Sequence, residues 1–533
     1  MATTMAVLAQ VGDPEVGGLD LPQVEWVAIT PLLVLVGGAL FLLAASALIT
    51  RRLPRSTYAL LTVALSVGAI VGSAVLWDRV QDPERGEFSA LSGAITIDGF
   101  SIFFSVLIAV SIGLAALLAD DYLRREGLDG PELYALMLLS GAGGITMAMA
   151  NDLIVVFLGL EILSIALYVM AGMHLRRRES QESAIKYFVL GSFSSAFLLY
   201  GIALTYGATG STNLSDISTF LSRNVLESEG LLLAGFALLL VGLGFKVAAV
   251  PFHVWTPDVY QGAPSPVTAF MASASKAAAF AALLRVFFSA FSTHATDWRP
   301  IIWVLAVLTM VVGAVLAVVQ RDVKRMLAYS SINHAGFILV ALEANTARGV
   351  AGALFYLLAY AFMVIGSFAV VTLVGRRGDA AHDLDDYRGL SAQRPVLALA
   401  MTVFLLSQAG VPLTAGFFAK FYVIGAAADA GSYALAIIAM VTAVISAFLY
   451  LRIIVAMYFG GRDFGGRDAG GADAGEQPAE ADAGPVRGRI PVPLGAGLSL
   501  AIAIAFTLAV GVLPDLVADL ARDAVPVLIS TAP

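Results

Sequence analysis

The sequence predicts an all-α, polytopic membrane protein with about fourteen transmembrane helices, and two observations support this class. First, the 533 residues are 59% hydrophobic and 13% charged, whereas a soluble domain carries roughly 25% charged residues. Second, apolar runs of the length that a membrane-spanning helix needs recur along the whole chain. The chain also has no cysteine, which excludes disulfides, thiolate metal sites and cysteine-held iron–sulfur clusters.

Fourteen apolar runs are candidate spans, and the basic residues between them give their orientation. With alternating loops, 20 of the 31 Lys and Arg fall on one side, 6 fall on the other, and 5 lie inside apolar runs. The positive-inside rule puts the richer side in the cytoplasm, so both termini are predicted to be periplasmic. The spans begin near Trp26, Tyr58, Phe100, Leu133, Leu153, Ala184, Leu231, Pro266, Ile301, Met326, Gly349, Val396, Tyr433 and Leu494.

An internal repeat is visible in the middle of the chain. The string YFVLGSF at 187–193 resembles FMVIGSF at 362–368, and Lys246 and Lys420 are separated by a similar offset, 174 residues. Chance similarity between apolar helices is the alternative. Repeated units are common in transporters, and two units of five helices each would have inverted topology, because five is odd.

The repeat and the composition divide the chain into five segments. The first three spans occupy residues 1–132, and the last span and tail occupy 491–533. The two five-helix units are spans four to eight (133–299) and spans nine to thirteen (300–460). Between the second unit and the last span lies a Gly-, Ala- and Asp-rich stretch, 461–490, which is expected to be a flexible loop.

Each unit contains one predicted broken helix. Pro251 lies in the seventh span, and Gly410 and Pro412 lie in the twelfth. Proline cannot donate its backbone bond inside a helix and clashes with the preceding turn. Freed backbone groups are tolerated at membrane depth where they line a cavity or water. A simple kink is the alternative reading.

Charged residues inside apolar runs are the strongest functional signal. The acid is Glu161, and the bases are Lys246, Lys276, Arg285, Lys420 and Arg452. A charge at mid-membrane costs ~2.5–3.5 kcal/mol on insertion scales, so such residues usually mark an ion or proton path. Packing that only fixes helix positions is the alternative. The two arginines lie nearer span ends and are expected to snorkel or to anchor neighbouring subunits.

Four strings in these spans resemble the antiporter-like membrane subunits of respiratory complex I. They are LEILSIALYVMAG, GFKVAAVPFHVWTPDVYQGAPSPVTAFMASASKAAAF, RMLAYSSINHAGF and GVPLTAGFFAKFYV. Within that family, WTPDVYQGAPSPVTAF is most similar to the N-type subunits. The resemblance covers nearly the whole chain from the fourth to the thirteenth span.

The resemblance implies roles for five residues. Glu161 and Lys246 correspond to the family's ion pair between the fifth and seventh spans, and Lys276 corresponds to the central lysine of the eighth. Lys420 corresponds to the lysine of the twelfth span, as the exit or relay group. His334 would bridge the last two lysines, with a structural hydrogen bond as the alternative.

The same resemblance implies a function and a setting. The chain would be a proton-translocating, multi-pass subunit of a type I NADH:quinone oxidoreductase in a bacterial inner membrane, with subunits K and M as neighbours, the lipid bilayer as a further partner and no nucleic acid. It would hold no cofactor itself. FMN, iron–sulfur clusters and quinone, with menaquinone as the expected acceptor, would lie in or at other subunits.

Three alternatives remain at this point. A cation/proton antiporter subunit would exchange Na⁺ or K⁺ without NADH. A structural scaffold would use its buried charges only to lock helices together. The same type of subunit could also belong to a complex fed by ferredoxin or F420, because the electron donor binds elsewhere.

Overall fold

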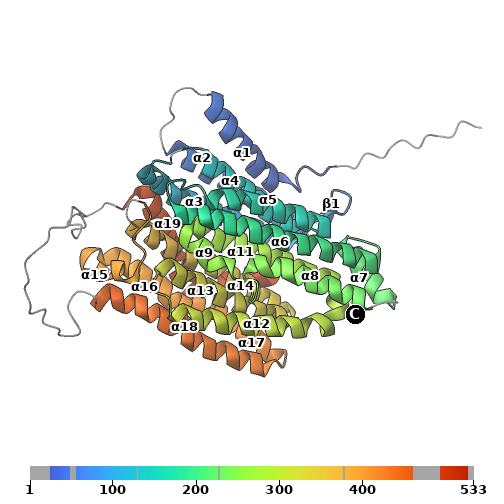
Figure 1. The fold of residues 1–533 in the computed structure, drawn as a ribbon. Helices are drawn as coiled ribbons and strands as arrows, with labels where there is room; N and C mark the ends of the chain where they lie inside the picture. Colours follow the sequence, from blue (N-terminus) through green and yellow to red (C-terminus); the bar gives the residue numbers. More distant parts are fainter. Residues whose placement is uncertain are drawn as a thin grey trace, which may run out of the picture.

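The structure is a computed structural model that describes residues 24–48, 56–128, 130–225, 229–375, 378–459 and 492–525. In these ranges, twelve helices are long and apolar enough to cross a membrane, and they lie side by side in one bundle (Figure 1). The predicted all-α membrane fold is therefore confirmed. The loop predicted at 461–490 lies outside the described residues.

The helices follow the apolar runs of the sequence. In chain order they are α1 (Thr30–Leu48), α2 (Thr57–Gln81), α3 (Gly99–Glu126), α4 (Glu132–Met149), α5 (Leu153–Ala171), α6 (Arg178–Thr209), α7 (Leu214–Arg223), α8 (Glu229–Val247), α9 (Trp255–Gly262), α10 (Ser265–Phe270), α11 (Lys276–Arg285), α12 (Ala295–Val318), α13 (Val323–Glu343), α14 (Ala347–Val374), α15 (Leu390–Gln393), α16 (Pro395–Ala409), α17 (Ala415–Asp429), α18 (Tyr433–Phe459), α19 (Leu494–Val512) and α20 (Asp515–Asp523). Short π-helical segments, Met271–Ser275 and Val286–Ala290, flank α11. Two short strands, β1 (Phe88–Ala90) and β2 (Ile95–Ile97), pair antiparallel between α2 and α3.

Each of the fourteen predicted spans coincides with a helix or a broken helix. The two that are absent from the twelve long apolar helices are α13, which begins with charged residues, and the α16–α17 pair, whose halves are 15 residues each. That all fourteen cross the membrane stays a prediction.

The connections gather at the two ends of the bundle. At one end, isolated bridges join Ile95 to Ala150 and Asp152 to Asn213, so the connections after α2, α4 and α6 meet. At the other end, a bridge joins Asp322 to Asp383, which brings together the connections after α12 and α14. This grouping agrees with the predicted alternation of the spans. Which end faces the cytoplasm stays a prediction.

The division into five segments stays a prediction, because helices pack both within and across its boundaries. In the first unit α4 packs on α5 and α6 on α8, and in the second unit α12 packs on α13 and α14 on α17. The last span, α19, contacts α3 as well as α14 and α17, so it ties the N-terminal helices to the second unit. The inverted relation of the two units stays a prediction.

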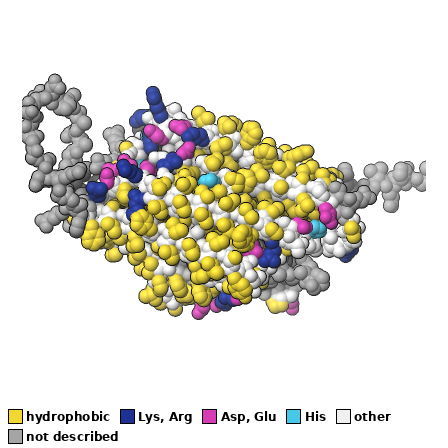
Figure 2. Space-filling view, turned by 60° about the horizontal axis from the view of Figure 1, so that its bottom comes forward, with side chains coloured by type: hydrophobic (Ala, Val, Ile, Leu, Met, Phe, Trp, Pro, Cys, Tyr) yellow, Lys and Arg dark blue, Asp and Glu magenta, His cyan; other side chains and the backbone are white. Residues whose placement is uncertain are grey.

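The two most buried spans form the centre of the bundle. They are Ser265–Ala290, which contains α11, and Ala347–Val374, which is α14. Glycines allow close helix contacts there: a Cβ on Gly313 of α12 would lie 2.6 Å from the backbone nitrogen of Asn333 on α13. Figure 2 shows hydrophobic side chains covering the middle of one face, with charged side chains gathered toward its ends. This is the distribution that a bilayer requires.

Candidate functional site

The first predicted broken helix is present and carries Lys246 at its edge. Helix α8 ends at Val247, residues 248–254 are not helical, and α9 begins at Trp255. The indole nitrogen of Trp255 donates to the carbonyl of Phe245 at 2.9 Å, which closes the turn. Lys246 is therefore held in the last turn of α8, where its side chain is buried.

Lys246 is bound by hydroxyl groups and not by a carboxylate. Its Nζ donates to Oγ of Ser164 at 2.8 Å and to the hydroxyl of Tyr187 at 3.1 Å. The Tyr187 ring stacks on Trp255, with ring centroids 4.5 Å apart. The break in the seventh span and the helices α5 and α6 thus share one buried polar centre.

The predicted ion pair between Glu161 and Lys246 is wrong as a direct contact. The structure describes both residues, yet no salt bridge joins them, and Oε1 of Glu161 is buried without a hydrogen-bond partner. Glu161 and Ser164 are one turn apart on α5 and so share a face. The ammonium group donates to the serine hydroxyl. Oε1 of the carboxylate has no direct partner, although the charge of Glu161 still acts on Lys246.

Lys276 begins α11 directly after the π-helical segment Met271–Ser275, in the most buried span of the bundle. Its Nζ donates to the carbonyl of Ser331 at 2.7 Å and also to the Ser331 hydroxyl. The same ammonium lies 5.8 Å from the centre of the Tyr360 ring. Lys276 therefore connects the first unit to α13 of the second.

His334, one turn after Ser331 on α13, is bonded at both ring nitrogens. Nδ1 lies 2.6 Å from the hydroxyl of Tyr356 and Nε2 lies 3.1 Å from that of Tyr450. Lys276 and Lys420 are both close enough to act on this imidazole electrostatically. His334 therefore lies in the same buried region as the two lysines, and its role as a bridge between them stays a prediction.

A hydrogen-bonded chain leads from His334 to the second broken helix. The Tyr450 hydroxyl lies 2.6 Å from Oγ of Ser330, which donates to the side-chain oxygen of Gln408 at 3.2 Å. The amide nitrogen of Gln408 in turn donates to Ser367 at 2.7 Å. The chain therefore joins four helices, α13, α14, α16 and α18.

Lys420 lies at the second break. Helix α16 ends at Ala409, Gly410 adopts φ +91°, and α17 begins at Ala415. Nζ of Lys420 turns back across this break and donates to the carbonyl of Ala409 at 2.9 Å. Ala409 follows Gln408, so the lysine binds next to the end of the hydrogen-bonded chain.

Of the two roles expected for Arg285, snorkelling is wrong, and an anchor to a neighbouring subunit stays a prediction. Its side chain is 3% exposed and forms a bidentate ion pair with Asp98, which is 1% exposed. It also donates to the carbonyl of Ala148 at 2.9 Å. Arg452 donates to the carbonyl of Val318, the last residue of α12. Sequence position alone suggested access to the span ends, but both groups find partners inside the chain.

A second buried cluster, around Asp379, was missed by sequence reasoning. Its fully buried carboxylate accepts from Arg177 at 3.0 Å, Lys324 at 3.2 Å, Ser265 at 3.0 Å and His382 at 2.9 Å. Burial alone raises the pKa of this carboxyl, but Lys324, His382 and Arg177 hold the pKa well below its usual range. Three of the four partners come from distant stretches of chain, and the only local signal is the fourth, a histidine three residues after the acid.

Comparisons with known proteins agree with this architecture. Residues 150–446 match the family described as NADH:quinone oxidoreductase/Mrp antiporter, TM. The chain is 50% identical over 371 residues to NADH-quinone oxidoreductase subunit N of Trichlorobacter lovleyi, which covers 70% of this chain and 76% of the relative. It is 41% identical over 536 residues to subunit N of Acidothermus cellulolyticus, covering 96% and 98%.

Solved structures give the same result. A chain of respiratory complex I from Thermus thermophilus with bound aureothin superposes with a TM-score of 0.72 at 33% identity, covering 92% of this chain and 99% of that one. A chain of the Mrp complex from Dietzia sp. superposes with a TM-score of 0.79 at 21% identity, covering 95% and 97%, and shows a shared fold. This chain belongs to the antiporter-like membrane subunits of NADH:quinone oxidoreductase, in the subunit N family.

Proposed function

We propose that this chain carries protons across the bacterial inner membrane, coupled to NADH-to-quinone electron transfer in other subunits of its complex. The observation that carries the proposal is the hydrogen-bonded chain from His334 through Tyr450 and Ser330 to Gln408. Lys276 binds beside one end of this chain and Lys420 beside the other. Imidazole and hydroxyl groups both donate and accept, so His334, Tyr450 and Ser330 can pass a proton between them. The Gln408 amide does not carry a proton and instead orients the Ser330 hydroxyl at the end of this row.

The three lysines suit proton storage because of what holds them. Lys246, Lys276 and Lys420 each donate to hydroxyl or carbonyl oxygens, and none makes a salt bridge within the described part of the chain. An ammonium group held by neutral oxygens loses a proton more readily than one locked in an ion pair. Glu161, with an unpartnered oxygen one turn from Ser164, is the group that would exchange a proton with Lys246.

The assembly would be a translocase, with this chain as one of its proton paths. In this proposal the chain holds no cofactor; FMN, the iron–sulfur clusters and quinone, with menaquinone as the acceptor, lie in or at other subunits, and subunits K and M are the direct neighbours. Both termini would face the periplasm, as the charge bias of 20 to 6 indicates. Reporter tags on the two ends test that orientation, and a cytoplasmic signal from either end contradicts it.

A one-atom change tests the hydrogen-bonded chain. Tyr450→Phe removes the hydroxyl between His334 and Ser330 with little change in volume. The matched control is Tyr387→Phe, because Tyr387 is also buried but its hydroxyl has no hydrogen-bond partner. In inverted vesicles that contain the whole complex, the proton gradient per NADH oxidised should fall for Tyr450→Phe and stay normal for Tyr387→Phe. Equal pumping in both variants rejects the relay.

Two substitutions of Lys246 separate a relay from a scaffold. Lys246→Met removes the titratable group but keeps the bulk, so assembly should survive while coupled NADH oxidation falls. Lys246→Arg should also be impaired, because arginine does not release a proton in proteins. Full activity of the Met variant would falsify the relay role. Full activity of the Arg variant alone supports the scaffold reading, and Na⁺ or K⁺ exchange without NADH supports an antiporter.

A further inference from the structure

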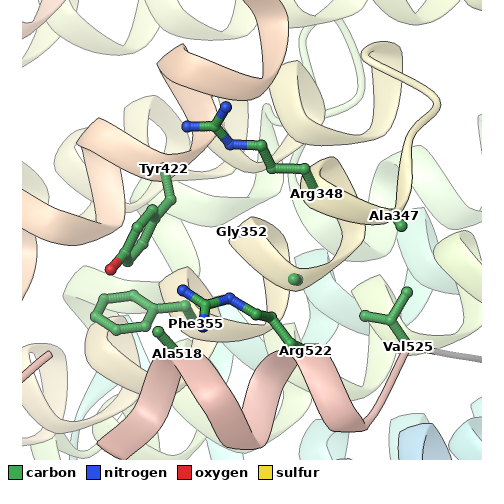
Figure 3. A pocket seen from close by; sticks show the side chains of 9 residues that line it. Ala347, Arg348, Gly352, Phe355, Tyr422, Ala518, Arg522 and Val525 are labelled. Atoms are coloured by element: carbon green, nitrogen blue, oxygen red, sulfur yellow. The ribbon is translucent and has the colours of Figure 1, made fainter. Parts of the chain in front are cut away.

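A cavity of about 520 Å³ lies between the start of α14, α17 and the short C-terminal helix α20. Ala351, Gly352, Phe355 and Ala518 form much of its apolar lining, and Tyr422 adds its ring. Figure 3 shows Arg348 and Arg522 on opposite sides of the cavity, with the rings of Tyr422 and Phe355 beside them. The volume is in the range of binding sites for small molecules.

The surroundings put this cavity at the edge of the bilayer. Helix α14 begins at Ala347, α17 ends at Asp429 and the last span ends at Val512, so three helix ends meet there. Helix α20 follows with a buried face on α14 and exposed leucines, Leu516 at 74% and Leu520 at 37%. An amphipathic helix of this kind lies in the plane of the membrane interface. The cavity is thus at the depth of lipid headgroups.

Each arginine at the cavity brings a carboxylate with it. Arg348 pairs with Asp429, and Arg522 pairs with Asp519. All four side chains are more than half exposed, and exposed pairs of this kind contribute only ~0–1 kcal/mol. A guanidinium has five N–H donors, so each arginine can bind an additional anion while its carboxylate remains beside it.

This pattern of two cations, two anions and an apolar floor fits a zwitterionic lipid. We infer that the cavity binds one phospholipid with a phosphate and a primary ammonium, of the phosphatidylethanolamine type. The phosphate would bind Arg348 and Arg522, the ammonium would bind Asp429 or Asp519, and an acyl chain would cover Phe355. A purely anionic headgroup is less suitable, because α20 carries three aspartates and a single arginine.

The test compares lipid retained by the whole purified complex. Arg348→Gln combined with Arg522→Gln removes both cations, and Arg85→Gln combined with Arg388→Gln is the control, because those arginines are also exposed and also paired with aspartates. Lipids that remain after detergent washing are extracted and counted by mass spectrometry. The test variant should lose one phosphatidylethanolamine per complex relative to wild type, and the control should lose none.

A cavity-filling variant keeps the charges and so tests the apolar part alone. A Cβ on Gly352 would meet its nearest atom, in Tyr422, at 3.5 Å, so Gly352→Leu can extend into the cavity. It should displace the same lipid with both arginines present. A second readout uses delipidated complex to which phosphatidylethanolamine is added back. The lipid concentration that gives half of the stabilisation should be roughly tenfold higher, or more, in the double arginine variant than in wild type.

Four outcomes overturn the inference. Equal retention of phosphatidylethanolamine in wild type and both cavity variants means that no such site exists. Loss of phosphatidylglycerol or cardiolipin instead means that the site selects anionic lipid. Equal stabilisation by phosphatidylcholine, whose trimethylammonium cannot donate hydrogen bonds, removes the role of the aspartates. Loss of a neighbouring subunit without loss of lipid makes the surface a protein interface.

Discussion

Replacing Asp379 by Asn should destabilise the chain strongly, although no predicted proton group is changed. Asp379 and Lys324 are both fully buried and form an ion pair. Asp379 has φ +51°, a left-handed conformation that asparagine also tolerates, so the substitution removes the charge and little else. Removing one partner of a buried pair costs about 3–5 kcal/mol.

The remaining contacts reduce this figure. The side-chain oxygen of Asn can still accept one hydrogen bond, worth about 1 kcal/mol. Lys324 also keeps its bond to the carbonyl of Ala263 at 2.7 Å. We therefore expect a loss of about 2–4 kcal/mol for Asp379→Asn. The double variant with Lys324→Met removes both charges and should recover part of that loss, because Lys324 is then no longer a buried ion without its carboxylate. Arg177, which also binds Asp379, is 15% exposed and keeps Glu179 beside it.

The assay heats the purified complex and records the temperature at which this subunit dissociates from it or aggregates. It is run for wild type, both single variants and the double variant. The pKa of Asp379 lies below that of an unfolded aspartate, which is about 3.9. Its contribution is therefore present above that value and is lost as the pH falls through the folded pKa. The gap between wild type and Asp379→Asn should be constant from about pH 5 to 8. The ion-pair argument is refuted by either of two results. One is a transition temperature of Asp379→Asn equal to that of wild type within error, and the other is a double variant that is no more stable than Asp379→Asn.

Three further changes have definite expected results. Arg285→Met leaves Asp98 buried without its bidentate partner and should cost about 3–5 kcal/mol in the same thermal assay; an unchanged midpoint contradicts this. Gly416→Ala puts a Cβ 1.8 Å from the carbonyl oxygen of Ser407, so the amount of this subunit in purified complex should fall. Normal incorporation of the variant would show that the second helix break can shift to make room for a methyl group. Partial desolvation and the nearby Asp98 raise the pKa of Glu87 to about 7, against an opposing effect of Arg285. Because the Glu87 side chain is exposed to solvent, stability should decline only slightly as the pH rises from 4.5 to 7, and a Glu87→Gln variant should lack that slope.

The spans and the breaks could be predicted because single residues encode them. Apolar length gives a transmembrane helix whatever its neighbours are, and Pro251 and Gly410 interrupt helices by their own backbone chemistry. The structure has helix breaks between residues 247 and 255 and between residues 409 and 415, and these breaks contain Pro251 and Gly410.

The partners of the charges could not be predicted in the same way. Tyr187, Tyr356 and Tyr450 are ordinary aromatic residues of apolar helices in the sequence, and only the packing of four or five helices turns their hydroxyls toward a lysine or a histidine. The expectation for Glu161 failed for the same reason. Opposite charges on neighbouring spans suggest a pair, but the side chain that Lys246 reaches is decided by one turn of α5.

The second helix break also explains how a buried lysine can exist with no carboxylate bound to it. Lys246 is in the last turn of α8, and Lys420 donates to Ala409, the last residue of α16. The carboxyl end of a helix carries a partial negative charge and carbonyls without intrahelical partners. At the second break such a carbonyl supplies the partner that no carboxylate does, because Nζ of Lys420 donates to Ala409. At the first break the side-chain hydroxyls of Ser164 and Tyr187 hold Nζ of Lys246 instead. A proton that leaves Lys420 leaves no directly paired acid behind, whereas Glu161 stays close to Lys246 with an unpartnered oxygen. The second break, more than an ion pair, is therefore the feature suited to a reversible proton site.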